Sequence, residues 1–238
     1  MNIKFKFRFF IFFLIVCLSC ASGIGRAFAS CPSDSGQVVT VTGGLKVEAN
    51  DFAYILKGIP SGVAKTTPGV GCSVGGFVFF DIHKSLALQI DLFYHFRQTK
   101  VEQQGNTGDL YSLSVELPFY VMGQWRFKDC SRLYLGTGPT VEFGYYAVIK
   151  GQGGTFDLYQ KDDETELSAM QNTSMGWAIL FGYEFAFGLQ FNVTYKGGFY
   201  NVLDANRTEV GAYPCALSLG VGYRFGLTAP KNTGGHGH

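Results

Sequence analysis

The sequence predicts an all-β fold, namely an eight-stranded antiparallel up-and-down barrel that spans a membrane. Apolar and polar residues alternate strictly along several stretches, which is typical of strands with two unlike faces. Charged residues make up only 16% of the 238 residues, whereas a soluble domain has roughly a quarter. The connections between the predicted strands alternate between long and short, as they do in outer-membrane barrels.

The first 29 residues are expected to be a secretory signal peptide that the mature protein lacks. Basic residues precede the apolar run FFIFFLIVCL over 9–18, which is too short for a helix that crosses a bilayer in about 20 residues. The tripeptide AFA over 27–29 fits the small-x-small cleavage pattern and would make Ser30 the first mature residue. The tripeptide SCA over 19–21 is a competing site, and lipidation at Cys20 or Cys31 is a less favoured alternative.

The stretch LALQIDLFYHFR over 86–97 shows the alternation most clearly. Its even positions are all apolar or aromatic, whereas its odd positions include polar and charged residues. Similar alternation recurs along the chain. We therefore expect eight strands, close to residues 43–50, 70–81, 86–97, 111–124, 133–145, 176–185, 189–196 and 213–225. Pro118 and Pro139 fall within these strands, where we expect bulges or bends.

The lengths of the connections predict how the barrel is oriented. Long connections are expected at 51–67, 98–109, 149–173 and 201–211, and short ones at 82–85, 128–131 and around Gly188. In outer-membrane barrels the long loops lie outside, and the short turns face the periplasm. The barrel would occupy residues 43–226, between a periplasmic N-terminal segment at 30–42 and a flexible C-terminal tail at 227–238.

The composition of the two strand faces indicates which one faces lipid. One face is apolar, and it includes Leu86, Leu88, Ile90 and Leu92. The other face is rich in Gly, Ala and Ser with a few charges, which suits the narrow interior of an eight-stranded barrel. The charged residues expected inside are Lys46, Glu48, Asp91, Arg97, Glu116, Glu142, Glu184, Lys196 and Arg224. We expect ion pairs among them to plug the lumen, and the alternative is a proton or ion path.

Aromatic residues are expected on both faces. Candidates for the girdles at the two membrane interfaces are Trp125, Tyr145, Trp177, Tyr183, Tyr195 and Tyr223. The aromatic residues expected to fill the interior are Phe77, Phe79, Phe93, Tyr120, Tyr134 and Tyr146.

Segments spread along the chain resemble the PorT-like outer-membrane β-barrel domain family of Gram-negative bacteria. They are GLKVEAN, SLALQIDLFYHF, LYSLSVELPFYV, SRLYLGTGPTVEFGY and ALSLGVGYRFG, in this order, and the resemblance covers roughly residues 43–226. It implies an integral outer-membrane barrel and no catalysed reaction. The chain departs from the pattern by the tail LTAPKNTGGHGH, since many barrels end on the aromatic residue that assists assembly.

An enzymatic alternative rests on His95 and Ser112. If neighbouring strands pair these two inward positions, a nucleophile and a base would meet near the outer rim, with Asp91 orienting the histidine. This arrangement would suit a lipid-modifying hydrolase or acyltransferase of the outer membrane. A polar hydrogen bond at the rim is the favoured interpretation, because no nucleophile-elbow motif accompanies the pair.

Neither a cofactor nor a metal is expected. Cleavage after residue 29 leaves Cys31, Cys72, Cys130 and Cys215, an even number that permits three pairings in an oxidising compartment. They form no CxxC pair, so zinc chemistry lacks the required spacing. We expect Cys31–Cys130 if any disulfide forms, since both lie on the periplasmic side.

The predicted function is that of a non-enzymatic protein integral to the cell outer membrane. Its expected partners are outer-membrane lipid, the barrel assembly machinery, and an envelope protein or extracellular ligand bound through loops or wall. The net charge of +1 gives no reason to expect a nucleic-acid partner. A soluble lipocalin-like carrier, with the apolar face inside, is a third class of function.

Overall fold

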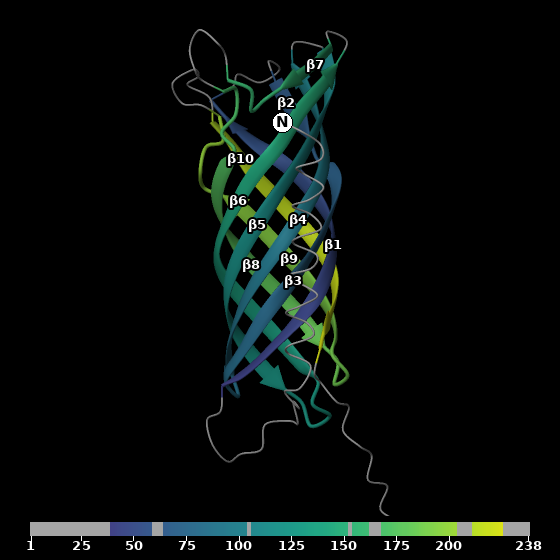
Figure 1. Cartoon of the computed structure of the whole chain (residues 1–238), viewed down its shortest axis with the longest axis vertical. Coiled ribbons are helices and arrows are strands. Elements are labelled where there is room, and N and C mark those ends of the chain that lie inside the picture. The colour runs from purple at the N-terminus through teal and green to yellow at the C-terminus, as the bar shows by residue number, and fades with distance from the viewer. Residues whose placement is uncertain are drawn as a thin grey trace, which may run out of the picture.

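Eight long strands form the wall of the barrel, and two short strands extend it at one end (Figure 1). The wall strands are β1 (Thr40–Lys57), β3 (Gly69–His83), β4 (Leu86–Gln103), β5 (Asn106–Arg126), β6 (Arg132–Gly151), β8 (Thr173–Glu184), β9 (Leu189–Gly198) and β10 (Gly211–Arg224). The short strands are β2 (Ala64–Thr67) and β7 (Gly154–Asp157). The computed structural model describes residues 39–58, 64–103, 106–151, 154–161, 168–203 and 211–225.

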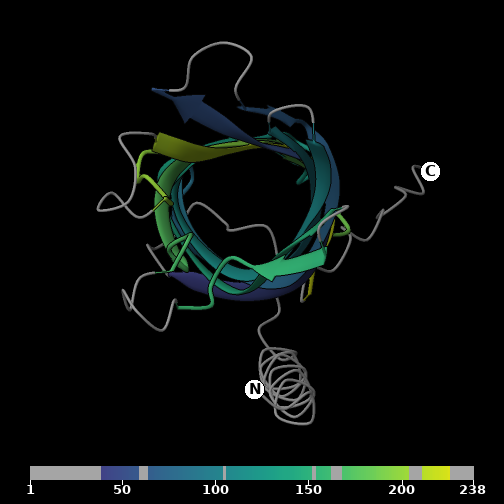
Figure 2. The same cartoon turned by 90° about the horizontal axis from the view of Figure 1, so that it is seen from above.

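Antiparallel pairing between β1 and β10 closes the sheet into a ring (Figure 2). This ladder runs from the pair Gly44 and Arg224 to the pair Lys57 and Gly211. Each remaining wall strand pairs with its neighbours in chain order, also antiparallel. A closed ring leaves no unpaired backbone edge to face lipid. The predicted eight-stranded up-and-down barrel is therefore confirmed. No helix among the described residues is long and apolar enough to cross a membrane.

The two ends of the barrel differ in how the strands are connected. At one end, which we call the turn end, short turns join β3 to β4, β5 to β6 and β8 to β9, as predicted. At the opposite end, the loop end, the strands extend further than predicted. β1 continues to Lys57, and β4 and β5 stay paired up to Gln103 and Asn106, within the predicted loop at 98–109. The strands stay paired beyond the residues that alternate between apolar and polar, because backbone hydrogen bonds between strands do not depend on a lipid-facing surface.

The inner and outer faces of the wall follow the predicted alternation. Leu86 and Leu88 are exposed on the outside, whereas Asp91 and His95 are buried inside. Trp125 and other aromatic side chains also lie exposed on the outside. The charged face therefore points into the barrel, and the apolar face forms its outer surface. A lipocalin-like carrier would require the opposite arrangement.

No register shift occurs at the prolines. The ladders skip Pro118 between β4 and β5 and Pro139 between β5 and β6, but the register is the same on both sides of each gap, so the predicted bulges are wrong, whereas the alternative of bends stays a prediction. The register of β5 and β6 shifts instead where Leu113 lies opposite Tyr146 and Ser114 lies opposite Gly144. The extra residue in β6 moves Tyr146 to the outward face. Its predicted interior position is therefore wrong, because alternation alone does not locate an inserted residue.

The turn between β5 and β6 is held by local contacts. The carboxylate of Asp129 accepts hydrogen bonds from the Ser131 backbone N–H at 3.2 Å and from the Ser131 hydroxyl at 2.6 Å. These hydrogen bonds lower the pKa of Asp129. Cys130 between them has a positive φ of 66°, a conformation that occurs in tight turns. The turn thus presents Cys130 at the turn end, where it is disulfide-bonded.

A charge on the outer wall should be costly at mid-height and tolerated near the loop end. We expect Leu117→Arg to lower the folding stability by about 2–4 kcal/mol, and Val70→Arg by only about 0–1 kcal/mol. Leu117 lies near the middle of β5, whereas Val70 lies near the loop end and is 77% exposed. Urea titrations of folding into lipid vesicles measure both, with Leu117→Met as the volume-matched control. Equal losses in the two arginine variants would contradict the lipid-facing assignment.

We predict that the partner of Cys130 is Cys31, which lies outside the described residues. Cys72 and Cys215 are free, and they lie opposite Ala49 and Ala53 on the two sides of β1. They are two strand spacings of roughly 4.8 Å each apart, and this total exceeds the Cα–Cα distance of about 7 Å that a disulfide can bridge. Peptide mapping under non-reducing conditions should recover a Cys31–Cys130 peptide. A Cys72–Cys215 peptide would instead contradict the register of β1.

Candidate functional site

Side chains fill the interior in successive layers from the turn end to the loop end. We call the first the arginine layer, and it consists of Asp81, Arg126, Arg132, Glu184 and Arg224. Asp81 accepts from Arg126 at 2.5 Å and from Arg224 at 3.2 Å. Glu184 accepts from Arg132 at 2.8 Å and from Arg224 at 2.5 Å. The two carboxylates therefore bridge three guanidinium groups.

An apolar layer follows, and it comes from five of the eight wall strands. Its buried members are Phe77, Phe79, Ala87, Tyr120, Met122, Tyr134, Ala178 and Leu180. Guanidinium and ammonium groups cover it from both sides, because Arg132 lies 4.0 Å from the Phe79 ring and Lys46 lies 5.2 Å from the Phe77 ring. Such contacts between cations and aromatic rings are attractive. The apolar layer is thus held between two charged layers.

Glycines on the neighbouring strands, directly opposite the aromatic residues in the ladders, make room for two of these rings. A Cβ atom at Gly182 would lie 2.4 Å from the Tyr134 ring, and one at Gly44 would lie 2.3 Å from the Phe77 ring. The amide of Gln190 on β9 is also buried and donates to Glu184. Small residues beside large ones on neighbouring strands therefore let the rings fit into the narrow interior.

Beyond the apolar layer lies a continuous line of hydrogen bonds, which we call the histidine chain. It consists of Asn50, Ser73, His95, Glu116 and Lys196. The Asn50 amide donates to Ser73 Oγ at 2.6 Å, and Ser73 Oγ lies 2.5 Å from His95 Nδ1. His95 Nε2 lies 2.7 Å from Glu116 Oε2, which also accepts from Lys196 at 2.5 Å. Since Glu116 is the acceptor at Nε2, Nδ1 is free to accept from the Ser73 hydroxyl.

The structure does not bring together the predicted catalytic residues His95, Ser112 and Asp91. In the β4–β5 ladder, His95 lies opposite Ser114, and Ser112 lies opposite Arg97. Asp91 instead pairs with Lys46 at 2.9 Å and accepts from Gln89 at 2.7 Å. The predicted triad is therefore wrong. Sequence alternation placed these residues on the inner face, but it could not set the register between neighbouring strands.

All nine predicted interior charges take part in ion pairs with one another. The pairs are Lys46–Asp91 at 2.9 Å, Lys196–Glu116 at 2.5 Å, Lys196–Glu48 at 3.9 Å, Arg97–Glu142 at 2.6 Å and Arg224–Glu184 at 2.5 Å. The prediction missed Asp81, Arg126 and Arg132 of the arginine layer. Asp81 is near the end of an alternating run, and the two arginines flank a short turn. Because these three residues lie near strand ends, too few alternating neighbours surround them to assign them to the inner face.

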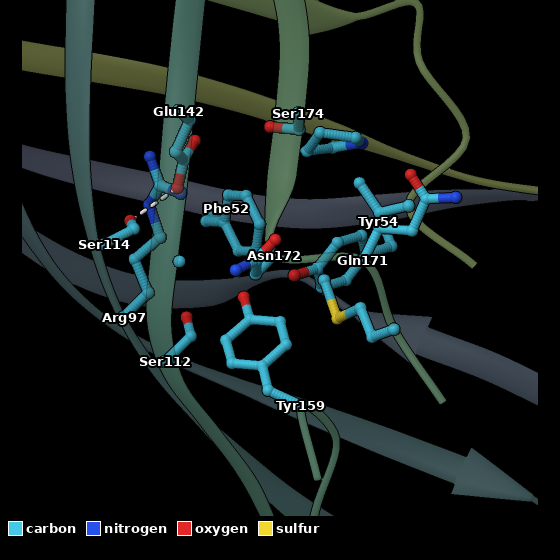
Figure 3. Close-up of a pocket in the computed structure, with 14 residues that line it drawn as sticks. Phe52, Tyr54, Arg97, Ser112, Ser114, Glu142, Tyr159, Gln171, Asn172 and Ser174 are labelled. Carbon is cyan, nitrogen blue, oxygen red and sulfur yellow. Dashed lines mark hydrogen bonds and ion pairs between the residues drawn. The ribbon is translucent and has the colours of Figure 1, made fainter. Parts of the chain in front are cut away.

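A cavity opens at the loop end, above the pair Arg97–Glu142 (Figure 3). We call it the mouth cavity. Its volume is about 350 Å³, including the part open to solvent. Glu142 accepts from Arg97 at 2.6 Å and from Ser114 at 2.5 Å, and the Arg97 guanidinium lies 4.4 Å from the Phe52 ring. The floor of the cavity is thus a charge pair that aromatic packing holds in place.

Segments between the wall strands form the side of the mouth cavity. Backbone bonds join Gly144 N to Asn172 O at 2.6 Å and Gln171 N to Val202 O at 2.7 Å. Tyr159 reaches in from the segment after β7, and its hydroxyl takes the space that a Cβ at Gly144 would occupy. Burial raises the pKa of Tyr159 above its usual range. These contacts fix the lining residues in position.

The arrangement offers no metal centre, since no three His, Cys, Asp or Glu residues in the described ranges gather closely enough to hold an ion. What it offers chemically is a polar, partly aromatic cavity above a tightly paired interior.

Several solved barrels are similar to this chain. Neisserial surface protein A is 15% identical, the match covers 78% of this chain and 99% of that one, and the TM-score is 0.42. OprG from Pseudomonas aeruginosa is 13% identical, with 78% and 94% covered and a TM-score of 0.42. Ail of Yersinia pestis is 12% identical, with 77% and 98% covered and a TM-score of 0.40.

No curated protein matches the chain. The outer membrane protein beta-barrel domain, however, matches residues 29–204, which is more than half of the sequence. Together with the closed eight-stranded ring and its apolar outer surface, this match shows where the protein resides. The chain belongs to the outer membrane protein beta-barrel domain family and is located in the outer membrane.

Proposed function

We propose that this outer-membrane barrel is a non-enzymatic protein with a plugged lumen, which acts by binding a ligand or envelope partner at its loop end. The observation that carries the proposal is the apolar layer held between two charged layers. Phe79 and Tyr134 in this layer are 0% and 1% exposed. Eight strands enclose an interior just wide enough for such side chains.

The packing argues against a general pore. An ion that crossed the barrel would first have to displace the paired side chains of the arginine layer. It would then have to pass aromatic rings that offer no polar atoms in place of its bound water. Taking a charge out of water without a partner is costly. The cations on both sides of the rings are already engaged with Asp81, Glu184 and Asp91. The layers therefore act together as an obstruction in the wall-lined core.

The non-enzymatic part of the proposal rests on where the reactive groups lie. Ser73, His95 and Glu116 are hydrogen-bonded in the order that a nucleophile, base and acid require. Ser73 and His95 are 3% and 1% exposed, and neither lines the mouth cavity. A substrate would have no access to the Ser73 hydroxyl. A structural role in filling the lumen therefore fits the histidine chain better.

We also propose that the chain belongs to the narrower PorT-like group, as the segments from GLKVEAN to ALSLGVGYRFG suggest. Under this proposal the outer wall contacts outer-membrane lipid, and the barrel assembly machinery inserts the protein. The loop end, with its ordered cavity, is then the surface offered to an envelope partner or extracellular ligand.

The purified protein in planar bilayers should give no stable, large conductance steps. Deleting much of the segment at 149–173 should not create them, because the obstruction consists of side chains in the barrel interior and not of that segment. Replacing Phe79 and Tyr134 together by alanine should produce intermittent small currents, since it removes two rings of the apolar layer. Phe96→Ala is the matched control, because Phe96 lies exposed on the outside. Heat-dependent gel mobility reports whether each variant is folded, and steady porin-sized currents from the intact protein would refute the plugged lumen.

A further inference from the structure

We propose that the arginine layer is a carboxylate-binding site, and that its occupant is Asp34 of the chain's own N-terminal segment, which pairs with the guanidinium group of Arg126. The N-terminal segment is residues 31–38, which lie outside the described residues. This inference goes beyond the proposed function, because it concerns the turn end and not the ligand of the loop end.

The first argument is the charge of the arginine layer. Three guanidinium groups face two carboxylates there, so the layer carries one positive charge in excess. The negative charge that offsets it lies on the loop side of the apolar layer, where rings such as Phe79 keep it out of contact. A charge taken out of water is stabilised best by a partner that pairs with it directly. The layer therefore favours a further carboxylate that approaches from the turn end.

The second argument is the supply of free donors. The Nε–H groups of Arg126, Arg132 and Arg224 are buried, and no described residue accepts a hydrogen bond from them. Arg126 donates to Asp81 through Nη2, and its side chain, at 25% exposed, is the most accessible of the three arginines. A guanidinium group binds a carboxylate through two parallel N–H donors. Arg126 thus has a free side for a second carboxylate.

The third argument is where the two ends of the N-terminal segment are fixed. At one end the segment continues into β1, and Thr40 at the start of β1 lies opposite Asp81. At the other end Cys31 is the predicted partner of Cys130, which is disulfide-bonded in the turn between β5 and β6. β3 and β4 separate β1 from this turn on one side of the ring, and β10, β9 and β8 separate it on the other. A segment tied at both points has to cross the turn end beneath the arginine layer.

The fourth argument is the length of the N-terminal segment. Eight strands spaced about 4.8 Å apart and tilted by about 40° form a ring about 16 Å across. The nine steps from Cys31 to Thr40 span up to about 30 Å when extended, so they can cross the ring. Asp34 is the only charged residue at 30–38, and it lies three residues from Cys31 and six from Thr40. Its carboxylate therefore falls beneath the barrel interior, where the excess positive charge is.

The test measures how Asp34 and the disulfide depend on each other in the mature protein in lipid nanodiscs. In a glutathione buffer, two glutathione thiols supply the two electrons and two protons that reduce the disulfide, and they leave as one glutathione disulfide. Pairing of Asp34 and closure of the disulfide favour each other by the same factor. We expect Asp34→Asn to shift the equilibrium towards the reduced protein by about two- to five-fold, as for a partly exposed ion pair. Asp34→Glu should restore it. Mass spectrometry of alkylated peptides that contain Cys130 reports the equilibrium.

Matched variants identify the partner of Asp34. Ser35→Asn adds an amide beside Asp34 without removing a charge, and it should leave the equilibrium unchanged. In an Arg126→Gln background, Asp34→Asn should have no further effect. In a Lys128→Gln background it should keep its full effect, although Lys128 is an exposed cation of the same turn. Loss of the effect in the Lys128→Gln background alone, or no effect of Asp34→Asn by itself, would overturn the inference.

A second measurement reports the contact directly and needs no change in the arginine layer. Nitrogen-15 spectra resolve the Nε–H groups of buried arginines, and the signal of Arg126 should shift when Asp34 is replaced by asparagine. Arg97 is the internal control, because its Nε–H group is also buried without a partner among the described residues but lies towards the loop end. An unchanged Arg126 signal, or an equal shift of the Arg97 signal, would contradict the pairing.

Inorganic phosphate separates the tethered occupant from a free anion. In the Asp34→Asn protein, phosphate should move the Arg126 signal in a saturable way, because no carboxylate then competes for the guanidinium group. In the unaltered protein the response should be at least roughly ten-fold weaker, since a tethered carboxylate has a high effective concentration. Equal responses would show that the layer takes anions from solution, and would overturn Asp34 as the occupant. A non-reducing peptide map that joins Cys130 to a cysteine other than Cys31 would overturn it as well.

Discussion

The ladder between β1 and β10 is the constraint on which the rest of the structure depends. Lipid cannot accept or donate hydrogen bonds, so a sheet can cross it only when its first and last strands pair. Closure with eight strands then fixes a narrow interior, and every second residue must fit inside it. The exposure of Leu88 to lipid and the burial of Asp91 both follow from this one geometric condition.

The narrow interior explains why glycine and aromatic residues face one another there. Gly182 lies beside Tyr134 and Gly44 beside Phe77 on neighbouring strands, so each ring can lie over a position that has no side chain. The charged residues on either side obey the same limit on space. Arg132 contacts the Phe79 ring with its guanidinium plane and still reaches Glu184. One side chain thus links the apolar layer with the arginine layer.

Much of the fold could be predicted from the sequence, because alternation with period two determines which face a residue joins. The eight strands, the three short turns and the inward position of the nine charged residues follow from that pattern. The register between strands does not, and the pairing of His95 with Ser73 instead of Ser112 depends on it. The bulge beside Tyr146 and the long paired ends of β4 and β5 could not be predicted either, since neither changes the apolar periodicity of the sequence.

The layered interior separates charge along the barrel axis. The arginine layer holds three guanidinium groups and two carboxylates. On the loop side of the apolar layer, the four carboxylates of Glu48, Asp91, Glu116 and Glu142 face only three cations, since the His95 ring is neutral in the hydrogen-bonding pattern described above. Each half carries an excess charge that the other half balances across the rings. The interior is therefore a fixed electric dipole with its negative end towards the mouth cavity, and neither half would be electrically neutral if it assembled alone.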